Sequence, residues 1–256
     1  MAILKSLYRY PLKGFSAQAL HGEVLTFDQP FPFDRLHALT RPGSKVDPDS
    51  PHWAHKSNFV MLMQEEVLAS FDTDFDVNSA RLQVRNKGRL LLDVSLSDPR
   101  GRQEFEALII QALALTNAAK PISLVSALPG SQLHFMDKAD AVISVINLAS
   151  VRALSHDLGC EIDPMRFRAN LYIDAAEPWA EFDWIGESID LGQARLVVDR
   201  RNSRCAATNV NPKTAKRDQT LPKSLRNLYG HCDMGVYVKV VRGGRITCGD
   251  EVKVTV

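Results

Sequence analysis

The chain has 256 residues, of which 45% are hydrophobic and 24% are charged; these proportions are typical of a folded globular protein and exclude disorder as its main state. Lys and Arg number 31 and Asp and Glu number 30, which gives a formal net charge of +1. A protein that coats nucleic acid or an anionic membrane normally carries a basic excess, so we expect neither as a partner. The length fits one large domain or two modest ones.

The first half of the chain is expected to consist mainly of short strands. Alternation of apolar and polar residues predicts strands over residues 2–9, 34–40, 81–86 and 89–95, of which the last two form a hairpin. Such short strands separated by turn residues favour a closed or sandwiched β architecture.

Between and after these strands we expect a loop and two helices. Residues 41–57 are too rich in Pro for regular structure. Apolar residues spaced by three or four positions predict a short helix over residues 64–71 and a longer one over 102–115, which residues 117–121 stop. We place a domain boundary at that stop. It divides the chain into residues 1–118 and 119–256.

The second half repeats the β-rich pattern and adds helices over residues 148–158, with Gly159 as the cap, and 221–228. Strands are predicted over residues 141–146, 171–174, 188–191, 195–199, 206–210, 236–242, 245–247 and 251–256. The whole chain is therefore expected to be mainly β with a few helices, in the α+β class.

The cysteines and the apolar segments indicate the compartment. There are four cysteines and no C-x-x-C pair: Cys160, Cys205, Cys232 and Cys248. So few thiols do not make a disulfide scaffold and suit a reducing compartment. The first residues alternate without an apolar signal segment, and the most apolar stretch, residues 105–115, contains Glu106 and Gln111. We therefore expect a cytoplasmic protein with no membrane partner.

Cys205 is the most informative single residue. Arg200, Arg201 and Arg204 precede it within five positions, and an electropositive neighbourhood favours the thiolate over the thiol. A thiolate is the soft ligand or nucleophile that a metal or a sulfur-transfer step needs. The local pattern also fits a cysteine at the end of a strand beside a solvated basic run, and taken alone it favours this structural interpretation.

The other cysteines give weaker signals. Cys160 and Cys248 are expected to be small buried hydrophobic residues. His231 and Cys232 are both ligand types, but adjacent residues on a strand point to opposite faces, so we expect no zinc site.

Cationic residues recur in three further segments, at Lys13, Arg35 and the pair Arg166 and Arg168. An isolated Lys or Arg is usually surface charge. If these side chains converge on one cleft they form an anion site, in which Arg can hold phosphate through two hydrogen bonds.

Several motifs together resemble those of the MOSC family, named for the C-terminal domain of molybdenum cofactor sulfurase. Near the N-terminus, Tyr10-Pro11-Leu12-Lys13 resembles Y-P-x-K and Phe33-Asp34-Arg35 resembles G-D-R. Farther on, residues 166–170 resemble R-F-R-P-N, residues 184–192 resemble W-x-G…I-x-x-G, residues 204–214 resemble R-C-x-x-T-x-V-[DN]-P-x-T, and residues 235–237 and 249–252 match the C-terminal stretch. The cysteine motif is the most specific.

The resemblance implies a MOSC β-barrel preceded by the β-barrel-like N-terminal domain that often accompanies it. It implies that Cys205 either ligates molybdenum or carries sulfur, so that its functional interpretation is preferred. In the branch that includes the amidoxime-reducing enzymes, the molybdenum cofactor, a Mo-pyranopterin, is the bound group. The residues that the resemblance assigns to that cofactor are Lys13, Arg35, Asn147, Arg168, Asn170, Arg204 and Thr208, with backbone N–H groups from Asn147 to Ser150 at a helix N-terminus.

Three departures from the family pattern concern contacts to the pterin: Gly14 stands where Ser is common, Phe33 replaces Gly, and Ala169 replaces Pro. Neither a ferredoxin domain nor the pyridoxal-phosphate-dependent domain of cofactor sulfurases is expected within this chain, so pyridoxal phosphate is an association of the family only.

Three functions remain open. The first is a molybdenum-dependent oxidoreductase that reduces N-oxygenated small molecules and takes electrons from an external electron-transfer protein or reductase. The second is a sulfur carrier that holds a persulfide on Cys205 for maturation of a metal–sulfur cofactor. The third is a cofactor-binding module without catalysis.

Overall fold

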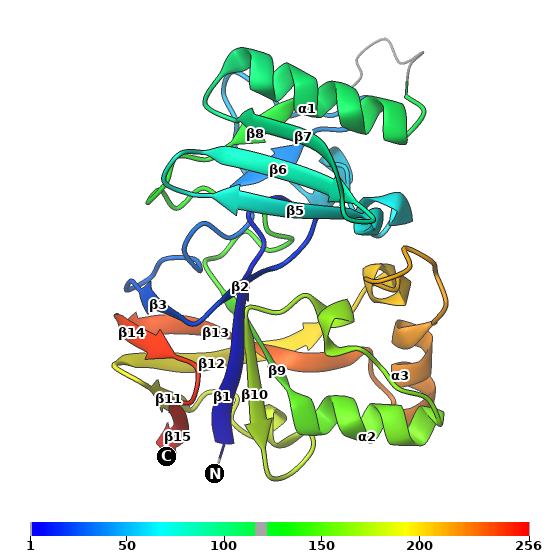
Figure 1. The fold of residues 1–256 in the computed structure, drawn as a ribbon. Helices are drawn as coiled ribbons and strands as arrows, with labels where there is room; N and C mark the ends of the chain where they lie inside the picture. The colour runs from blue at the N-terminus through cyan, green and yellow to red at the C-terminus, as the bar shows by residue number, and fades with distance from the viewer. Residues whose placement is uncertain (1, 116–121, 256) are drawn as a thin grey trace.

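The computed structural model describes residues 2–115 and 122–255. Two lobes stand one above the other in the ribbon view, with both termini at the base of the lower lobe (Figure 1). The expected helix stop at residues 117–121 and the domain boundary at residue 118 lie outside the described residues. No helix in the described ranges is long and apolar enough to cross a membrane.

The lower lobe is a closed seven-stranded barrel. Its strands follow the order β10-β9-β13-β12-β11-β15-β1, and β1 pairs back with β10. Only β9 and β10 run parallel, and the short strand β2 extends the sheet beyond β1. The strands are β1 (Ala2–Arg9), β2 (Gln18–Leu20), β9 (Ile143–Asn147), β10 (Leu171–Ala175), β11 (Ser188–Leu191), β12 (Ala194–Ser203), β13 (Asp233–Arg242) and β15 (Glu251–Thr255). The α+β, mainly β prediction is confirmed.

Alternate residues of these strands fill the barrel with aliphatic side chains, such as Leu4, Leu196, Val198 and Val238, each with no exposed surface. Two helices, α2 (Leu148–Leu158) and α3 (Leu221–Tyr229), pack outside through a second apolar cluster. The cap predicted at Gly159 is confirmed, because this residue ends α2 with φ +65°.

The upper lobe packs a three-stranded sheet against α1 (Pro99–Ala112), around Phe15, Phe71 and Phe105. The sheet contains β5 (Phe71–Asp76), β6 (Arg81–Asn86) and β7 (Arg89–Ser95), so the predicted hairpin is confirmed. Asp98 caps α1 and Pro99 occupies its first turn, which starts the helix three residues before the prediction. Two small pairs complete the described strands: β4 (His37–Leu39) with β8 (Leu124–Ser126), and β3 (Gly22–Leu25) with β14 (Gly244–Thr247).

One predicted strand is wrong. Residues 206–210 form a 3-10 helix, η5 (Ala206–Asn209), because the carbonyl of Cys205 accepts hydrogen bonds from both the amide and the hydroxyl of Thr208. The short helix expected over residues 64–71 is a 3-10 turn that leads into β5. The described 3-10 turns are η1 (Lys56–Asn58), η2 (Glu66–Ser70), η3 (Pro164–Phe167), η4 (Ala180–Phe182) and η5.

Candidate functional site

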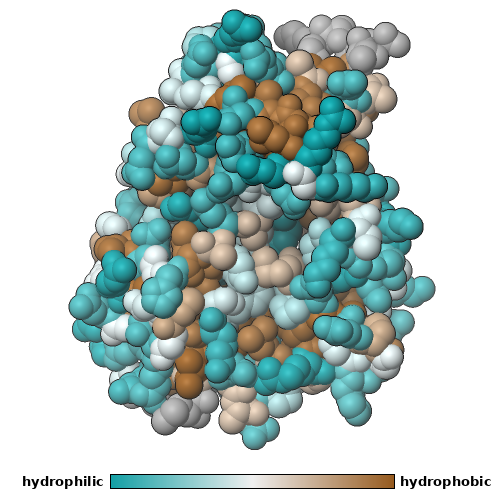
Figure 2. Space-filling view, in the orientation of Figure 1, coloured by the Kyte–Doolittle hydropathy of each residue, from teal (hydrophilic) through white to brown (hydrophobic). Residues whose placement is uncertain are grey.

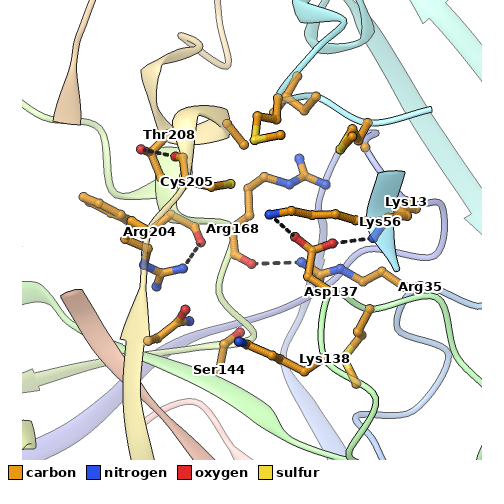
Figure 3. Close-up of a pocket in the computed structure, with 18 of the residues that line it drawn as sticks. Lys13, Arg35, Lys56, Asp137, Lys138, Ser144, Arg168, Arg204, Cys205 and Thr208 are labelled. Carbon is orange, nitrogen blue, oxygen red and sulfur yellow. Dashed lines mark hydrogen bonds and ion pairs between the residues drawn. The ribbon is translucent and has the colours of Figure 1, made fainter. Parts of the chain in front are cut away.

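A cavity of about 340 Å³ lies between the two lobes and is lined by side chains from both halves of the chain (Figure 3). In the space-filling view the surface is hollowed where the lobes meet, and hydrophilic side chains surround the hollow (Figure 2). Cys205 and six of the seven residues that the resemblance assigned to a cofactor line this cavity: Lys13, Arg35, Arg168, Asn170, Arg204 and Thr208.

The described lining is strongly cationic. Its only Asp or Glu is Asp137, which faces seven Lys and Arg side chains: Lys13, Arg35, Lys56, Lys138, Arg166, Arg168 and Arg204. Because opposite charges attract more strongly where water is partly excluded, this composition favours an anionic ligand.

Lys13 and Lys56 meet on Asp137. The buried Nζ of Lys13 donates to the Phe135 carbonyl at 2.8 Å and pairs with the Asp137 carboxylate, while Nζ of Lys56 lies 3.5 Å from that carboxylate. Burial opposes ionisation of Asp137, but Lys13, Lys56 and Arg35 outweigh it and lower its pKa to about 2. Burial lowers the pKa of Lys13, against the effect of Asp137.

Arg35 links the two lobes. It pairs with the buried Asp34, and its Nη2 donates to the backbone carbonyl of Arg168 at 3.1 Å. The guanidinium carbons of Arg35 and Arg168 lie 4.3 and 4.4 Å from the ring centroid of Tyr10. One motif of the first half therefore places two arginines beside the same aromatic ring.

The two arginines of the third motif differ. Arg166 is bound to the protein, since Nη2 pairs with Asp218 at 2.6 Å and Nη1 donates to the Asn209 carbonyl at 3.2 Å. Arg168 has φ +50°, a left-handed conformation that is uncommon outside glycine, and its buried Nη2 has no hydrogen-bond partner among the described residues. Burial lowers the pKa of Arg168. Arg168 is therefore a strained cation with an unused donor.

Cys205 follows the end of β12 and is half-buried, with its sulfur directed into the cavity (Figure 3). Arg204 beside it is fixed by hydrogen bonds to the carbonyls of Met234 at 2.9 Å and Phe167 at 3.1 Å. With its amide nitrogen placed 3.0 Å from the Tyr237 hydroxyl, Asn202 also accepts from both terminal nitrogens of Arg204.

The electropositive setting of Cys205 differs from the one predicted from its neighbours in sequence. Arg200 pairs with Asp140 and Asp199, and Arg201 stacks over Phe182, so neither lines the cavity. The cations that share the cavity with Cys205 come instead from distant segments, with Arg204 as the one sequence neighbour.

The structure does not bring Asn147 to the cavity. Asn147 is fully buried and caps α2 by accepting from the Ala149 amide at 3.0 Å. Its Nδ2 donates to Glu181 at 3.0 Å, and the Ser150 hydroxyl donates to the same carboxyl group at 2.9 Å. Burial raises the pKa of Glu181. The N-terminus of α2 is thus filled by a carboxyl group of the protein itself.

Asn170 lines the cavity but is committed to the fold. Its Oδ1 accepts from the hydroxyl and the amide of Ser144 at 2.8 and 3.2 Å, and its Nδ2 donates to the Tyr8 carbonyl. It therefore fixes the loop that carries Arg168 and has little capacity left for a ligand.

The remaining cysteines are all free. The prediction of a buried Cys160 is wrong, because the residue is exposed after the end of α2, whereas Cys248 is half-buried against the barrel core. Among the described residues no group of three or more His, Cys, Asp or Glu is placed to hold a metal ion. A metal in the cavity would therefore depend on Cys205 together with ligands that come from a bound cofactor.

Sequence reasoning missed Lys56, Lys138 and the three methionines of the lining, Met61, Met63 and Met136. They lie in loops and a 3-10 turn, where no periodic pattern predicts the direction of a side chain.

The residues present fit an anionic cofactor that carries a soft metal. The unpartnered Nη2 of Arg168 offers a donor to phosphate, and the thiol of Cys205 offers a ligand that suits molybdenum.

The second half of the chain is a MOSC domain: residues 130–253 match the family model with that description. The resemblance inferred from the motifs is confirmed for this half.

Curated relatives are named molybdenum cofactor sulfurase. The protein of Drosophila mojavensis is 28% identical over 138 residues, which are 50% of this chain and 18% of the relative. That of Danio rerio is 39% identical over 74 residues, 28% of this chain and 9% of the relative. The matched part is thus less than a fifth of these relatives.

Two solved structures are similar. YuaD from Bacillus subtilis is 13% identical, with a TM-score of 0.46 over 99% of this chain and 96% of that chain. YiiM from Geobacillus stearothermophilus is 18% identical, with a TM-score of 0.36 over 44% of this chain and 54% of that chain.

Proposed function

We propose that this protein binds the molybdenum cofactor between its lobes and reduces N-oxygenated small molecules. One observation carries the proposal: a half-buried thiol and a set of cations from both halves of the chain line the same cavity, where one arginine has an unused donor. The MOSC domain and the names of the relatives relate the chain to this cofactor at the level of the family.

In this proposal the chain's residues hold and orient the cofactor. Lys13, Arg35, Lys56 and Arg168 would bind the phosphate of the pterin, and the Cys205 thiolate would be the protein ligand of molybdenum. The bound cofactor would supply oxygen-atom transfer. The overall reaction balances as R–NHOH + 2 e⁻ + 2 H⁺ → R–NH₂ + H₂O, in which an external redox protein supplies the electrons and solvent supplies the protons.

The protein atoms around Cys205 would tune that ligand. Asn202 and two backbone carbonyls fix Arg204, so a positive charge stays beside the sulfur. We also propose a cytoplasmic location, because four free thiols suit a reducing compartment.

The test is the molybdenum content of protein purified from a host that makes the cofactor. We expect stoichiometric molybdenum with the absorption spectrum of a thiolate-ligated centre, and loss of both in Cys205→Ser. Cys232→Ser is the matched control, since that thiol is also half-buried but does not line the cavity. Metal-free protein that retains full reductase activity would contradict the proposal.

A sulfur carrier is the second candidate, and the relatives named molybdenum cofactor sulfurase favour it. Cys205 would then accept a sulfur atom from an external donor as a persulfide and pass it to a metal–sulfur site. An adduct of about 32 Da on Cys205 without bound pterin would support this function. If Cys205→Ala leaves cofactor binding and activity unchanged, the chain is a cofactor-binding module in which the thiol has no role.

A further inference from the structure

A second cavity, of about 200 Å³, adjoins the first and is used by none of the functions above. Gly14, Leu62, Arg166 and Arg168 line both cavities, whereas Cys205 and Lys13 line only the first. The two spaces therefore share a wall that contains the arginine with the unused donor, but the second has no access to the thiol through its own lining.

Unpartnered polar atoms concentrate around this second cavity. Among the described residues four buried side-chain N or O atoms lack a hydrogen-bond partner, and three belong to residues that line it: Tyr10 Oη, Arg166 Nε and Arg168 Nη2. Tyr10 is 1% and Arg166 5% exposed. The Tyr10 hydroxyl lies near that of Tyr172 but makes no hydrogen bond of acceptable geometry with it. Unpartnered buried donors are rare in native proteins and call for an acceptor.

The rest of the lining is mostly apolar. Its apolar residues are Phe15, Ala17, Leu62, Ala69, Met165, Val210 and Pro212. Of its two carboxylates, Asp163 is neutralised by Lys213 at 3.1 Å and also caps η3, and Asp72 is exposed. The cavity thus combines donors without partners and walls that favour a hydrocarbon or aromatic body.

We propose that the second cavity binds a small organic carboxylate with an apolar body. The carboxylate would accept hydrogen bonds from Arg166, Arg168 and Tyr10, and the body would pack against Phe15, Ala69 and Val210. A carboxylate is an acceptor only, and it matches the planar donors of arginine better than a neutral amide or alcohol does. This site is independent of the chemistry at Cys205.

Titration calorimetry with sodium benzoate tests the proposal, with benzyl alcohol as a probe of similar size that lacks the charge. We expect benzoate to bind at one site and benzyl alcohol to bind at least tenfold more weakly. Ala69→Phe and Ala17→Phe each fill the second cavity, and each should weaken benzoate at least tenfold. Tyr10→Phe should weaken it severalfold. Ala139→Phe is the control, because this residue is exposed and lines neither cavity.

Sulfate distinguishes the two cavities. Its affinity, which reports the first cavity, should change less than twofold in Ala69→Phe and Ala17→Phe. The proposal is overturned if benzoate does not bind, or if both filling variants leave its affinity unchanged. It is also overturned if Lys13→Gln abolishes benzoate binding, because the molecule then occupies the first cavity. None of these results depends on molybdenum content, so the proposed function stands or falls separately.

Discussion

The N-terminus of α2 and the cavity between the lobes are both places where donors and positive charge could hold an anion, and the chain treats them in opposite ways. At α2 the donors of Asn147 and Ser150 meet the buried carboxyl group of Glu181. In the cavity seven cationic side chains face one carboxylate, and a donor of Arg168 remains unused. A site that the protein fills with its own acid supports the fold, whereas a site with excess cations is available to a ligand.

The largest effect that tests this contrast is expected at Glu181. Glu181→Ala removes the acceptor of two buried side chains, so we expect the free energy of unfolding to fall by about 3 kcal/mol. Urea denaturation measures this loss. Sulfate affinity, measured where the variant is still folded, should stay within twofold of the parent protein. A fall in sulfate affinity of tenfold would show that the N-terminus of α2 takes part in anion binding after all.

At the cavity the opposite pattern is expected. Arg168→Gln removes the unpartnered guanidinium, and sulfate affinity should fall about tenfold, which is about 1.4 kcal/mol. The midpoint of urea denaturation should hardly move, because no protein acceptor loses a bond from Nη2. Lys216→Gln is the control, since it removes one charge from an exposed residue that does not line the cavity. Equal losses in the two variants would point to net charge rather than to a site.

A smaller gain is expected from the single carboxylate of the cavity. Asp137→Asn frees Lys13 and Lys56 from their ion pairs, so sulfate should bind about threefold more tightly. Asp140→Asn makes the same change in charge outside the cavity, where Asp140 pairs with Arg200. An unchanged affinity in Asp137→Asn would show that this carboxylate does not compete with the ligand.

The smallest effect is a dependence on pH. Because burial lowers the pKa of Lys13, this side chain loses its proton below the ordinary lysine value of about 10.4. Sulfate keeps its charge over this range, so its affinity should be full at neutral pH and decline as the pH rises through the lowered pKa. Calorimetry between neutral and alkaline pH measures the decline. Lys13→Arg should remove it, since arginine stays protonated.

The sequence predicted the β-rich fold and most of the site for different physical reasons. Strands such as β6 and β7 follow from alternation, and Gly159 ends α2 as expected, because these signals are local. Motif residues such as Cys205 and Arg168 were found through their resemblance to a family. Lys56 was missed, because its position follows from long-range folding of a loop that no local pattern specifies.

Misreadings of the site have the same origin. Asn147 stands at a strand-to-helix turn, and its use as a cap for α2 depends on a partner, Glu181, that lies 34 positions farther along the chain. Arg200 and Arg201 follow Cys205's neighbourhood in sequence but not in space, because acidic and aromatic side chains of the barrel hold them elsewhere.

The pairing of β1 with both β10 and β15 has a consequence for how the molecule is made. The segment that leaves the ribosome first is the one that closes the ring, so it must wait for partners synthesised about 170 and 250 residues later. Such sequence-distant contacts slow folding and prolong the time in which unpaired strand edges are open to association. A shortened chain that starts at residue 119 would lack this closing strand, and we expect it to aggregate through the free edges of β10 and β15.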